Sequence, residues 1–256
     1  MEPSAIIITQ ARIGSSRFPG KVLETIKGKT LLAIHLDRLK QSKLVSKIIV
    51  ATTFEPGVSE IINLTLAAGA EPFQGDLTNV LDRFYQAAKP HKPDYVIRVT
   101  SDCPLIDSRL IDKMLERAFF ENVDYLTNCL NPNFPDGQDV EIIRWNALVL
   151  AWQNATLLSD KEHVTPYIRK NCNVMGGTMF AALEFPSEGN YGNIRMTVDE
   201  VSDKKSIALL IEKLGDKAGW KLYADFVISN PDLFTNQDII RNQGYLNSLK
   251  YDNQNY

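Results

Sequence analysis

The stretch AIIITQARIGSSRFPGK, residues 5–21, decides how the chain is expected to fold. Residues 5–9 form a continuous apolar run with three isoleucines, which is typical of a strand buried on both faces of a sheet. A polar loop with two glycines follows at residues 10–21, and residues 30–42 then place leucines at helical spacing. This order predicts the first strand, loop and helix of a parallel sheet.

The same alternation continues through the first half of the chain. Because strands that alternate with helices form parallel sheets through right-handed crossovers, we predict an α/β fold with a mostly parallel central sheet and helices on both faces. Ligands bind such sheets beyond the carboxyl ends of the strands, where the loops after Thr9 and Thr100 lie. The predicted strands are 47–53, 72–74 and 95–100, and the predicted helices are 58–68, 80–88 and 106–120.

The second half is less regular. We interpret the chain as a single domain, residues 1–256, in which about 1–125 bind the nucleotide and 126–256 form the acceptor-binding and C-terminal part. A smaller substrate lobe is inserted in this second part. The predicted strands there are 140–144, 175–185 and 194–198, and the predicted helices are 162–170, 203–214 and 238–249.

Bulk properties narrow the class of protein. A net charge of −3 and a pI of about 5.7 argue against a protein that coats nucleic acid. No apolar run is long enough to cross a membrane, and the first residues lack the basic region of a secretory signal. Three scattered cysteines support neither a disulfide framework nor a zinc site. We therefore expect a cytoplasmic protein with no membrane or nucleic-acid partner.

The loop after the first strand carries the strongest functional signal. Arg12, Arg17 and Lys21 lie among glycines and serines, and glycines let backbone amides approach a polyanion closely. Arginines grip phosphate oxygens with paired hydrogen bonds, and a lysine adds a compact charge. The loop does not match GxxxxGK[ST] or GxGxxG. A solvated basic loop is the alternative, but the spacing favours a triphosphate site.

Two aspartates follow later predicted strands. Asp102 ends the run VIRVTSD at residues 96–102, and Asp199 ends IRMTVD at residues 194–199. Magnesium usually takes one or two protein carboxylates and fills its shell with phosphate and water. Either residue alone is explained equally well as a helix N-cap, but the pair beside a cationic loop predicts a Mg²⁺ site.

The loop resembles the ARxGSxRxPGK signature of the cytidylyltransferase superfamily, which includes the CMP-sialic acid and CMP-Kdo synthetases. The similarity is greatest to the spore-coat polysaccharide biosynthesis protein F branch and extends to residues 241–250, RNQGYLNSLK. The resemblance implies a Rossmann-like nucleotide-diphospho-sugar transferase fold, a homodimer, and transfer of CMP from CTP to a sugar-type acceptor. It assigns phosphate contacts to Arg12, Gly14, Ser15, Arg17 and Lys21, and it also includes Ala11 among the nucleotide-binding residues.

The resemblance also implies which residues perform the reaction. Asp102 matches the DCPL motif of the superfamily and Asp199 its TVD motif, both associated with magnesium. The expected catalytic set is therefore Arg12, Lys21, Asp102 and Asp199, with Asp102 also close to the nucleotide. In-line attack of the acceptor oxygen on the α-phosphorus, with loss of pyrophosphate, depends on positioning and charge stabilisation rather than on a dedicated base.

Weaker signals concern the base and the acceptor. Asp82 and Arg83 match the base-pocket segment, although the polar face of an amphipathic helix explains them equally well. Asp139 and Glu141 alternate along a predicted strand, so both are expected on one face, close to sugar hydroxyls. Gln138 stands where the branch more usually has leucine, which leaves acceptor preference open.

His163 and Arg169 fall in another matching segment, EHVTPYIR at residues 162–169, and are candidate acceptor contacts. A histidine in such a segment is more often structural than functional. The residues do not determine the base, the acceptor or the number of metal ions. A sugar-1-phosphate uridylyl- or guanylyltransferase and a non-catalytic nucleotide-binding partner protein remain alternatives.

Overall fold

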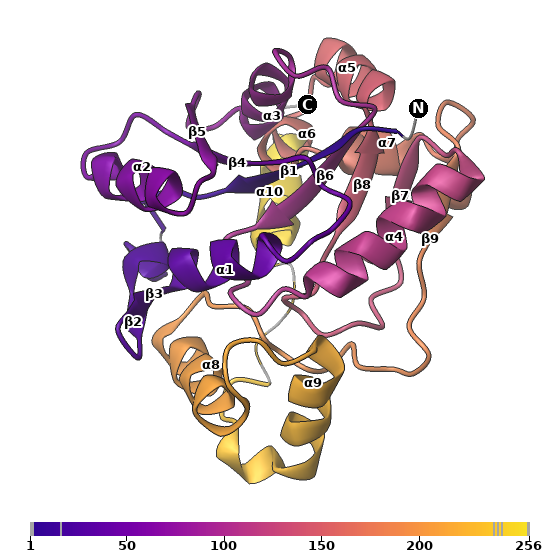
Figure 1. The fold of residues 1–256 in the computed structure, drawn as a ribbon. Coiled ribbons are helices and arrows are strands. Elements are labelled where there is room, and N and C mark those ends of the chain that lie inside the picture. The colour runs from indigo at the N-terminus through magenta and orange to yellow at the C-terminus, as the bar shows by residue number, and fades with distance from the viewer. Residues whose placement is uncertain (1–2, 16, 238, 240, 242, 255–256) are drawn as a thin grey trace.

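The computed structural model describes residues 3–15, 17–237, 239, 241 and 243–254. A seven-stranded sheet crosses this part of the chain in the order β5-β4-β1-β6-β8-β7-β9 (Figure 1). All neighbours are parallel except around β8, which runs antiparallel to β6 and β7. The strands are β1 Ala5–Gln10, β4 Lys47–Thr52, β5 Glu71–Gln74, β6 Tyr95–Thr100, β7 Tyr125–Thr127, β8 Glu141–Arg144 and β9 Ala182–Glu184.

Helices cover both faces of the sheet, as the sequence predicts. The isoleucines of β1 alternate between the faces, so Ile7 packs with one set of helices and Ile6 and Ile8 with the other. The first face is covered by α1 Leu31–Leu39, α2 Val58–Ala67 and α4 Ser108–Glu121. The second is covered by α3 Val80–Ala88, α5 Trp145–Asn154 and α7 Pro166–Lys170.

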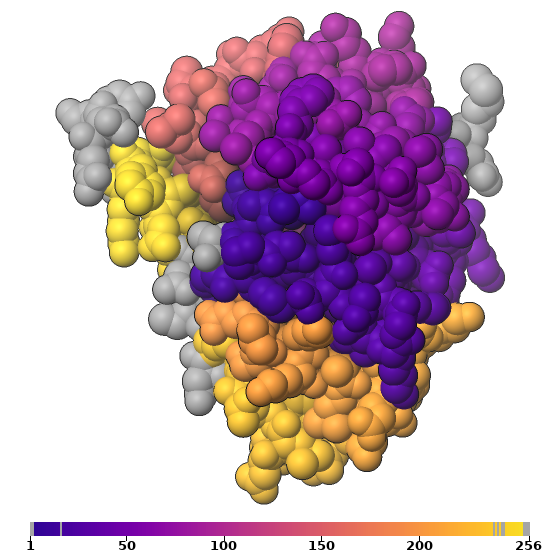
Figure 2. All heavy atoms as spheres, turned by 90° about the vertical axis from the view of Figure 1, so that its left-hand side faces the viewer, coloured from indigo at the N-terminus to yellow at the C-terminus, as the bar shows by residue number. Residues whose placement is uncertain are grey.

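A smaller lobe lies beside the carboxyl edge of the sheet and has its own apolar core. Helices α8 Val201–Leu214 and α9 Trp220–Ser229 form it, and its core includes Ile34 of α1 and Leu105. In Figure 2 this orange lobe lies directly against the indigo N-terminal segment. No helix in the described residues is long and apolar enough to cross a membrane.

Several elements of the second half differ from the prediction. The strand expected at 175–185 is limited to β9, because residues 173–175 form a 3-10 helix that ends at Gly176 with φ 87°. The strand expected at 194–198 does not form, and Arg195 makes only an isolated bridge to Asp136.

The helices of the second half differ as well. Instead of one helix over 162–170 there are two, α6 Leu158–His163 and α7, separated by Val164 with φ 71° and by the proline that begins α7. The last helix is α10 Gln243–Gln254 rather than 238–249, and residues 238, 240 and 242 lie outside the described part.

Other elements were not predicted. Helices α5 and α9 and strand β7 belong to this group, as does a small hairpin of β2 Thr25–Ile26 and β3 Lys29–Thr30. In α5 only Ala147, Leu148 and Ala151 are buried, while both tryptophans of the helix are half-buried, so its apolar stripe is hard to recognise in the sequence.

Candidate functional site

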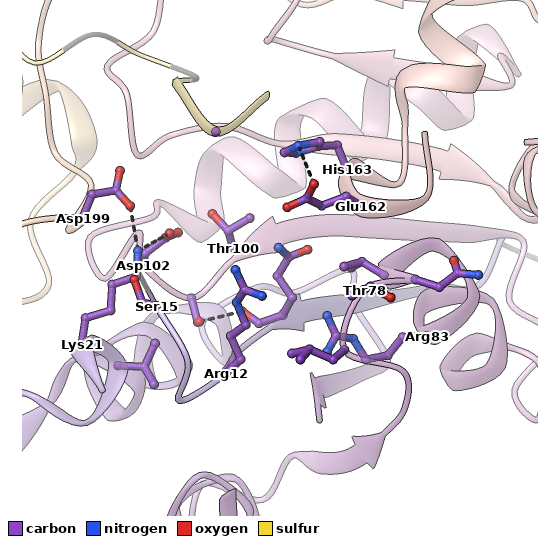
Figure 3. A pocket seen from close by; sticks show the side chains of 18 of the residues that line it. Arg12, Ser15, Lys21, Thr78, Arg83, Thr100, Asp102, Glu162, His163 and Asp199 are labelled. Atoms are coloured by element: carbon purple, nitrogen blue, oxygen red, sulfur yellow. Dashed lines mark hydrogen bonds and ion pairs between the residues drawn. The ribbon is translucent and has the colours of Figure 1, made fainter. Parts of the chain in front are cut away.

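A pocket of about 690 Å³ opens at the carboxyl ends of β1 and β6. Figure 3 shows Lys21, Asp102 and Asp199 gathered at one end of it, Thr78 and Arg83 at the other, and Arg12 between them. The candidate residues that line it come from segments far apart in the sequence, and they are Ala11, Arg12, Ser15, Arg17, Lys21, Arg83, Asp102, His163 and Asp199.

The loop after β1 is shaped by its glycines and by its own backbone. Gly20 adopts φ 69°, a conformation that favours glycine, and its N–H donates to the carbonyl of Ile13 at 2.9 Å. The N–H of Ser15 donates to the same carbonyl at 3.0 Å, so these two amides are already used. Gly14 does not line the pocket, and a Cβ there would meet Glu55 Oε1 at 2.3 Å. The loop therefore presents the side chains of Arg12 and Arg17, both exposed, to the pocket.

Lys21 joins the two predicted metal ligands. Its Nζ donates to Asp102 Oδ2 and to Asp199 Oδ1, each at 2.8 Å, and its side chain is only 10% exposed. Burial opposes the charge on Lys21, but the two carboxylates outweigh it and raise the pKa of Lys21. Burial likewise opposes ionisation of Asp102, yet Lys21 holds the pKa of that carboxyl below its usual range. Lys21 and Asp102 are therefore both charged at neutral pH.

Asp199 is oriented by a buried arginine that the sequence analysis missed. Arg195 is 3% exposed and donates from Nη2 to Asp199 Oδ2 at 3.1 Å, from Nη1 to Asp136 at 2.8 Å, and from Nε to Asp203 at 2.8 Å. Asp203 in turn accepts hydrogen bonds from the backbone N–H groups of Asp199 and Glu200 at the start of α8. Asp203 thus holds the backbone of Asp199, and Arg195 holds its carboxylate.

A second pocket of about 240 Å³ adjoins the first. Asp136, Asp139 and Arg169 line it, together with Arg98 of β6 and Tyr245 of α10. The two pockets share residues at their junction, which are Gln10, Arg17, Thr100, Asp102, His163, Asp199 and Gly244.

Glu141 does not line either pocket, contrary to the expectation that it contacts the acceptor. Its carboxylate is 1% exposed and pairs with Arg98 at 2.9 Å and with Arg169. It also accepts hydrogen bonds from Tyr125 and Thr165. Although burial opposes ionisation, Arg169 and Arg98 lower the pKa of Glu141 to about 2. Its oxygens are used within the protein, so Glu141 positions the two arginines that reach the pocket.

Asp139 does line the second pocket, next to Asp136 of the Pro-Asp-Gly sequence at residues 135–137, called the PDG turn below. Arg241 pairs with Asp139, and Arg195 with Asp136. Burial, reinforced by the neighbouring Asp139, raises the pKa of Asp136 to about 7, and burial also raises the pKa of Asp139. The PDG turn and the residues just after it therefore present two hydrogen-bonding carboxyl groups to the second pocket.

His163 lies at the junction of both pockets. Burial, with the charges of Arg98 and Arg169, lowers its pKa to about 4, so the ring is neutral at physiological pH. Its Nε2 is buried without a hydrogen-bond partner among the described residues, and its ring meets that of Tyr245 edge to face at 5.2 Å. Glu162 Oε2 lies 3.9 Å from this nitrogen, beyond hydrogen-bond distance. A neutral ring with a nitrogen that makes no hydrogen bond in the described part of the chain is suited to a hydrogen bond with a ligand.

Asp82 and Arg83 are neighbours in sequence, but only Arg83 lines the pocket. Asp82 Oδ1 accepts from Trp152 Nε1 at 2.8 Å and from Gln86 at 3.1 Å, and the structure does not bring Asp82 to the pocket. Arg83 lines the pocket, is 2% exposed, and has Nε and Nη1 buried without partners in the described part of the chain. Burial and the charge of Arg12 lower the pKa of Arg83 to about 10, which leaves it charged at neutral pH.

The sequence contained usable signals for some of the missed residues. Arg98 interrupts an otherwise apolar strand, and its Nε is buried without a partner among the described residues. Gln10 ends β1 at the ligand edge, and its Oε1 is buried and unpartnered within the same part of the chain. Arg195 and Arg241 carry no such signal, because only the folded chain reveals their carboxylate partners.

Gln138 does not line the second pocket. It is fully buried, accepts from the Asp107 N–H at 3.0 Å and donates to the Leu105 carbonyl at 2.9 Å. This side chain ties the PDG turn to the segment that follows Asp102. Glutamine in place of leucine at position 138 therefore changes the hydrogen bonds that hold the PDG turn in position, and it does not change the residues that line the pocket.

The chemistry of the donors can be compared with the needs of Mg²⁺. No group of three or more His, Cys, Asp or Glu side chains in the described residues forms a complete metal site. Asp102 and Asp199 direct one oxygen each at a common cation, the Lys21 ammonium. Because Mg²⁺ is usually held by one or two carboxylates together with substrate phosphates, this pair fits a metal that arrives with a nucleotide.

Comparison with known proteins agrees with the fold. A solved cytidylyltransferase from Leptospira borgpetersenii superposes with a TM-score of 0.86 at 30% identity, covering 93% of this chain and 100% of that one. The fold and the site thus define a Rossmann-like nucleotidyltransferase. The family model described as cytidylyltransferase matches residues 6–225, and the chain belongs to this family.

Two further relatives are similar over most of their length. The spore coat polysaccharide biosynthesis protein SpsF of Bacillus subtilis is 34% identical over 218 residues, which are 83% of this chain and 88% of the relative. The 3-deoxy-manno-octulosonate cytidylyltransferase of Fusobacterium nucleatum is 30% identical over 208 residues, or 81% and 79%. These similarities confirm the resemblance stated from the motifs.

Proposed function

We propose that this protein transfers CMP from CTP to a hydroxyl group of a sugar or sugar acid, with release of pyrophosphate, for the synthesis of a surface polysaccharide. Membership of the cytidylyltransferase family supports the nucleotide. The similarity to the spore coat polysaccharide biosynthesis protein of Bacillus and to the 3-deoxy-manno-octulosonate cytidylyltransferase of Fusobacterium supports a polysaccharide pathway and a sugar-acid acceptor. We propose a cytoplasmic location because all three cysteines are free thiols, as a reducing compartment would keep them.

One observation carries the proposal: the two pockets meet at the carboxylate pair. Asp102 and Asp199 line both cavities, so a phosphate held in the larger one and a hydroxyl held in the smaller one come together beside these residues. The larger pocket also holds the cations of the loop, and the smaller one holds Asp136 and Asp139. This arrangement suits attack by an acceptor oxygen on the α-phosphorus in line with the departing pyrophosphate.

Each group has a chemical task in this scheme. Arg12, Arg17 and Lys21 offset the charge of the triphosphate and of the leaving pyrophosphate. Asp102 and Asp199 would hold Mg²⁺, which when bound neutralises phosphate charge and orients phosphate oxygens. Arg83, at the far end of the pocket, donates to the nucleoside. In the step itself the acceptor oxygen forms a bond to the α-phosphorus, the bond to the bridging oxygen of the β-phosphate breaks, and the hydroxyl proton passes to solvent.

The acceptor pocket favours a ligand with several oxygens. Asp139 and Asp136 can accept hydrogen bonds from sugar hydroxyls, and the neutral His163 offers a further polar contact. Arg98 and Arg169, fixed by Glu141, add positive charge that suits a carboxylate on the acceptor. Carboxyl groups that bind hydroxyls, together with arginines that bind a carboxylate, favour a sugar acid over a neutral alcohol as the acceptor.

Release of pyrophosphate tests the proposal directly. The purified protein is incubated with CTP, Mg²⁺ and a panel that includes 3-deoxy-manno-octulosonate, other sugar acids, sugar phosphates and phosphorylated alcohols. We expect pyrophosphate only with CTP and only with one acceptor class, and loss of at least about 100-fold of the rate in Asp102→Asn. Turnover of a sugar 1-phosphate with UTP or GTP would establish the alternative transferase, and unchanged biological activity of Asp102→Asn would favour a non-catalytic nucleotide-binding protein.

We also propose that the protein is a homodimer, from its membership of this family. Light scattering coupled to size exclusion measures the mass directly, and a monomer of 28.8 kDa at micromolar concentration would contradict the proposal.

A further inference from the structure

The position of Lys21 has a consequence for the order of binding. Its Nζ lies 2.8 Å from one oxygen of Asp102 and 2.8 Å from one oxygen of Asp199, as the dashed lines in Figure 3 show. These are the two carboxylates to which the proposed function assigns the divalent cation. The ammonium therefore uses the same oxygens that a metal would need.

The two carboxylates depend on Lys21 to different extents. The other oxygen of Asp199 has Arg17 and Arg195 within 3.1 Å, so Asp199 keeps two cationic partners without Lys21. Asp102 has Lys21 as its one ion-pair partner within the described ranges. A divalent cation placed between the carboxylates would be repelled by the ammonium as long as the ammonium stays there.

We propose that Lys21 couples the two ligands: its ammonium occupies the carboxylate pair until a triphosphate attracts it, so the site takes a divalent cation well only together with the nucleotide. Lys21 lines the pocket beside Arg12 and Arg17, where the phosphates are expected to bind. A triphosphate supplies a new anionic partner for the ammonium and at the same time oxygens for the metal. Because linkage is reciprocal, bound metal also strengthens nucleotide binding.

This coupling prevents the site from trapping metal without substrate. The Lys21 side chain therefore has two functions. It competes with the metal before the nucleotide binds, and it binds phosphate once the nucleotide is in the pocket. This inference rests on the proposed function, since it takes Asp102 and Asp199 as the metal ligands. It needs no acceptor, however, so it is testable with metal and CTP alone.

The chain offers a matched control for the charge itself. Lys29 also bridges two aspartates, with Nζ 3.0 Å from Asp37 and 3.2 Å from Asp216, but its side chain is 47% exposed and it does not line the pocket. Replacing either lysine removes one positive charge between two carboxylates. Only Lys21 does so at the proposed metal site.

The experiment titrates Mn²⁺ into the full-length protein without nucleotide and follows free Mn²⁺ by electron paramagnetic resonance. We expect Lys21→Met to bind Mn²⁺ at least about 10-fold more tightly than the wild type, within the usual range of coupling between sites, and Lys29→Met to match the wild type. The same Lys21→Met variant is expected to bind CTP less tightly. Lys21→Gln, which keeps a polar hydrogen-bond donor of shorter reach without the charge, serves the same purpose if the methionine variant does not fold.

The outcomes separate the inference from the proposed function. In the double variant Lys21→Met/Asp102→Asn the gain in Mn²⁺ affinity is expected to disappear. If Asp102→Asn weakens Mn²⁺ binding but neither Lys21 variant tightens it, the coupling is wrong and the metal assignment stands. If Mn²⁺ affinity is insensitive to Asp102 in every background, the metal assignment and the coupling both fail.

Discussion

Two neighbouring residues of α3, Asp82 and Arg83, have different functions. Successive side chains of an α-helix point about 100° apart, so Asp82 and Arg83 at the start of α3 face different surroundings. Asp82 accepts a hydrogen bond from Trp152 of α5, whereas Arg83 enters the nucleotide pocket with two guanidinium nitrogens unpartnered within the described chain. A buried arginine without partners lowers stability unless a ligand supplies them.

We expect Arg83→Met to weaken CTP binding by at least about 10-fold, because a charge-assisted hydrogen bond is lost, and to leave the melting temperature unchanged or higher. Asp82→Ala is the matched control. It is expected to lower the free energy of unfolding by about 1 kcal/mol and to leave CTP affinity nearly unchanged. Calorimetric titration with CTP and thermal melts measure both quantities. The assignment would be reversed if Asp82→Ala were the variant that lost CTP affinity.

Glu141 is a buried acid that holds in position two arginines of the second pocket, Arg98 and Arg169. The pKa of Glu141 in the folded protein, about 2, lies below its ordinary value of 4.5. Its ionised form therefore stabilises the fold above pH 4.5, and that contribution is lost as the pH falls from about 4.5 to 2.

For Glu141→Gln we expect a loss of roughly 3 kcal/mol at pH 7, since one pKa unit corresponds to about 1.4 kcal/mol. The loss is expected to shrink at pH 4 and to be clearly smaller at pH 3. Urea denaturation of both proteins at the three pH values measures this difference. A loss that is constant over this range would show that ionisation of Glu141 does not stabilise the fold.

At the scale of elements, the acceptor side is built by a turn against an irregular segment. Gly137 has φ 108°, and a Cβ on it would meet the backbone of Met196 at 2.7 Å. The turn can therefore approach the segment that leads to Asp199 only with glycine in this place. The sequence showed ordinary turn chemistry in PDG, but the close approach depends on residues about 60 positions later.

We expect Gly137→Ala to destabilise the protein by about 2 kcal/mol or more, because strain at positive φ is combined with a backbone clash. Gly69→Ala is the control, since Gly69 has φ 72° but open space around its Cβ position. Its cost is expected to stay near 1 kcal/mol. Denaturant unfolding of the two variants gives both values, and equal losses would mean that the contact with Met196 yields without strain.

In the molecule as a whole, the larger pocket, where we propose that the nucleotide binds, joins the two halves of the chain. Asp102 comes from the predicted nucleotide-binding half, whereas His163 and Asp199 come from the second half, and Gly244 and Asn247 of α10 complete the lining. Helix α10 lies beyond the segment matched by the family model and packs against α6. A ligand in the pocket therefore contacts both halves at once.

We expect CTP with Mg²⁺ to raise the melting temperature, because a ligand that binds only the folded state stabilises it by about 2.7 kcal/mol at 100 times its dissociation constant. For a chain of this size that corresponds to roughly 5–10 °C. UTP and GTP are expected to give smaller shifts at equal concentration, and cytidine with Mg²⁺ little or none. Equal shifts with the three nucleotides would remove the support for cytosine selectivity.

The first half of the chain could be predicted from the sequence because its signals are local. Residues 5–9, 47–53 and 95–100 show the continuous apolar runs of buried strands, and the helices between them show regular apolar spacing. The cationic loop and Asp102 follow directly from this order, since parallel strands bring the residues after them to one edge. The α/β class, the pocket edge and several of the residues that line the pocket, among them Arg12, Lys21 and Asp102, were therefore accessible without a structure.

The remaining features depend on contacts between distant segments, which no local pattern encodes. Residues 194–198 look like a strand but pass between the sheet and the lobe, and α6 and α7 are divided at Val164. Three features arise only when the second half folds onto the first. Arg195 meets its carboxylate partners, and Glu141 is buried against arginines instead of lining a pocket. Lys21 forms its bridge between Asp102 and Asp199. The residue types determine which chemistry is possible, and the tertiary packing determines which charges meet.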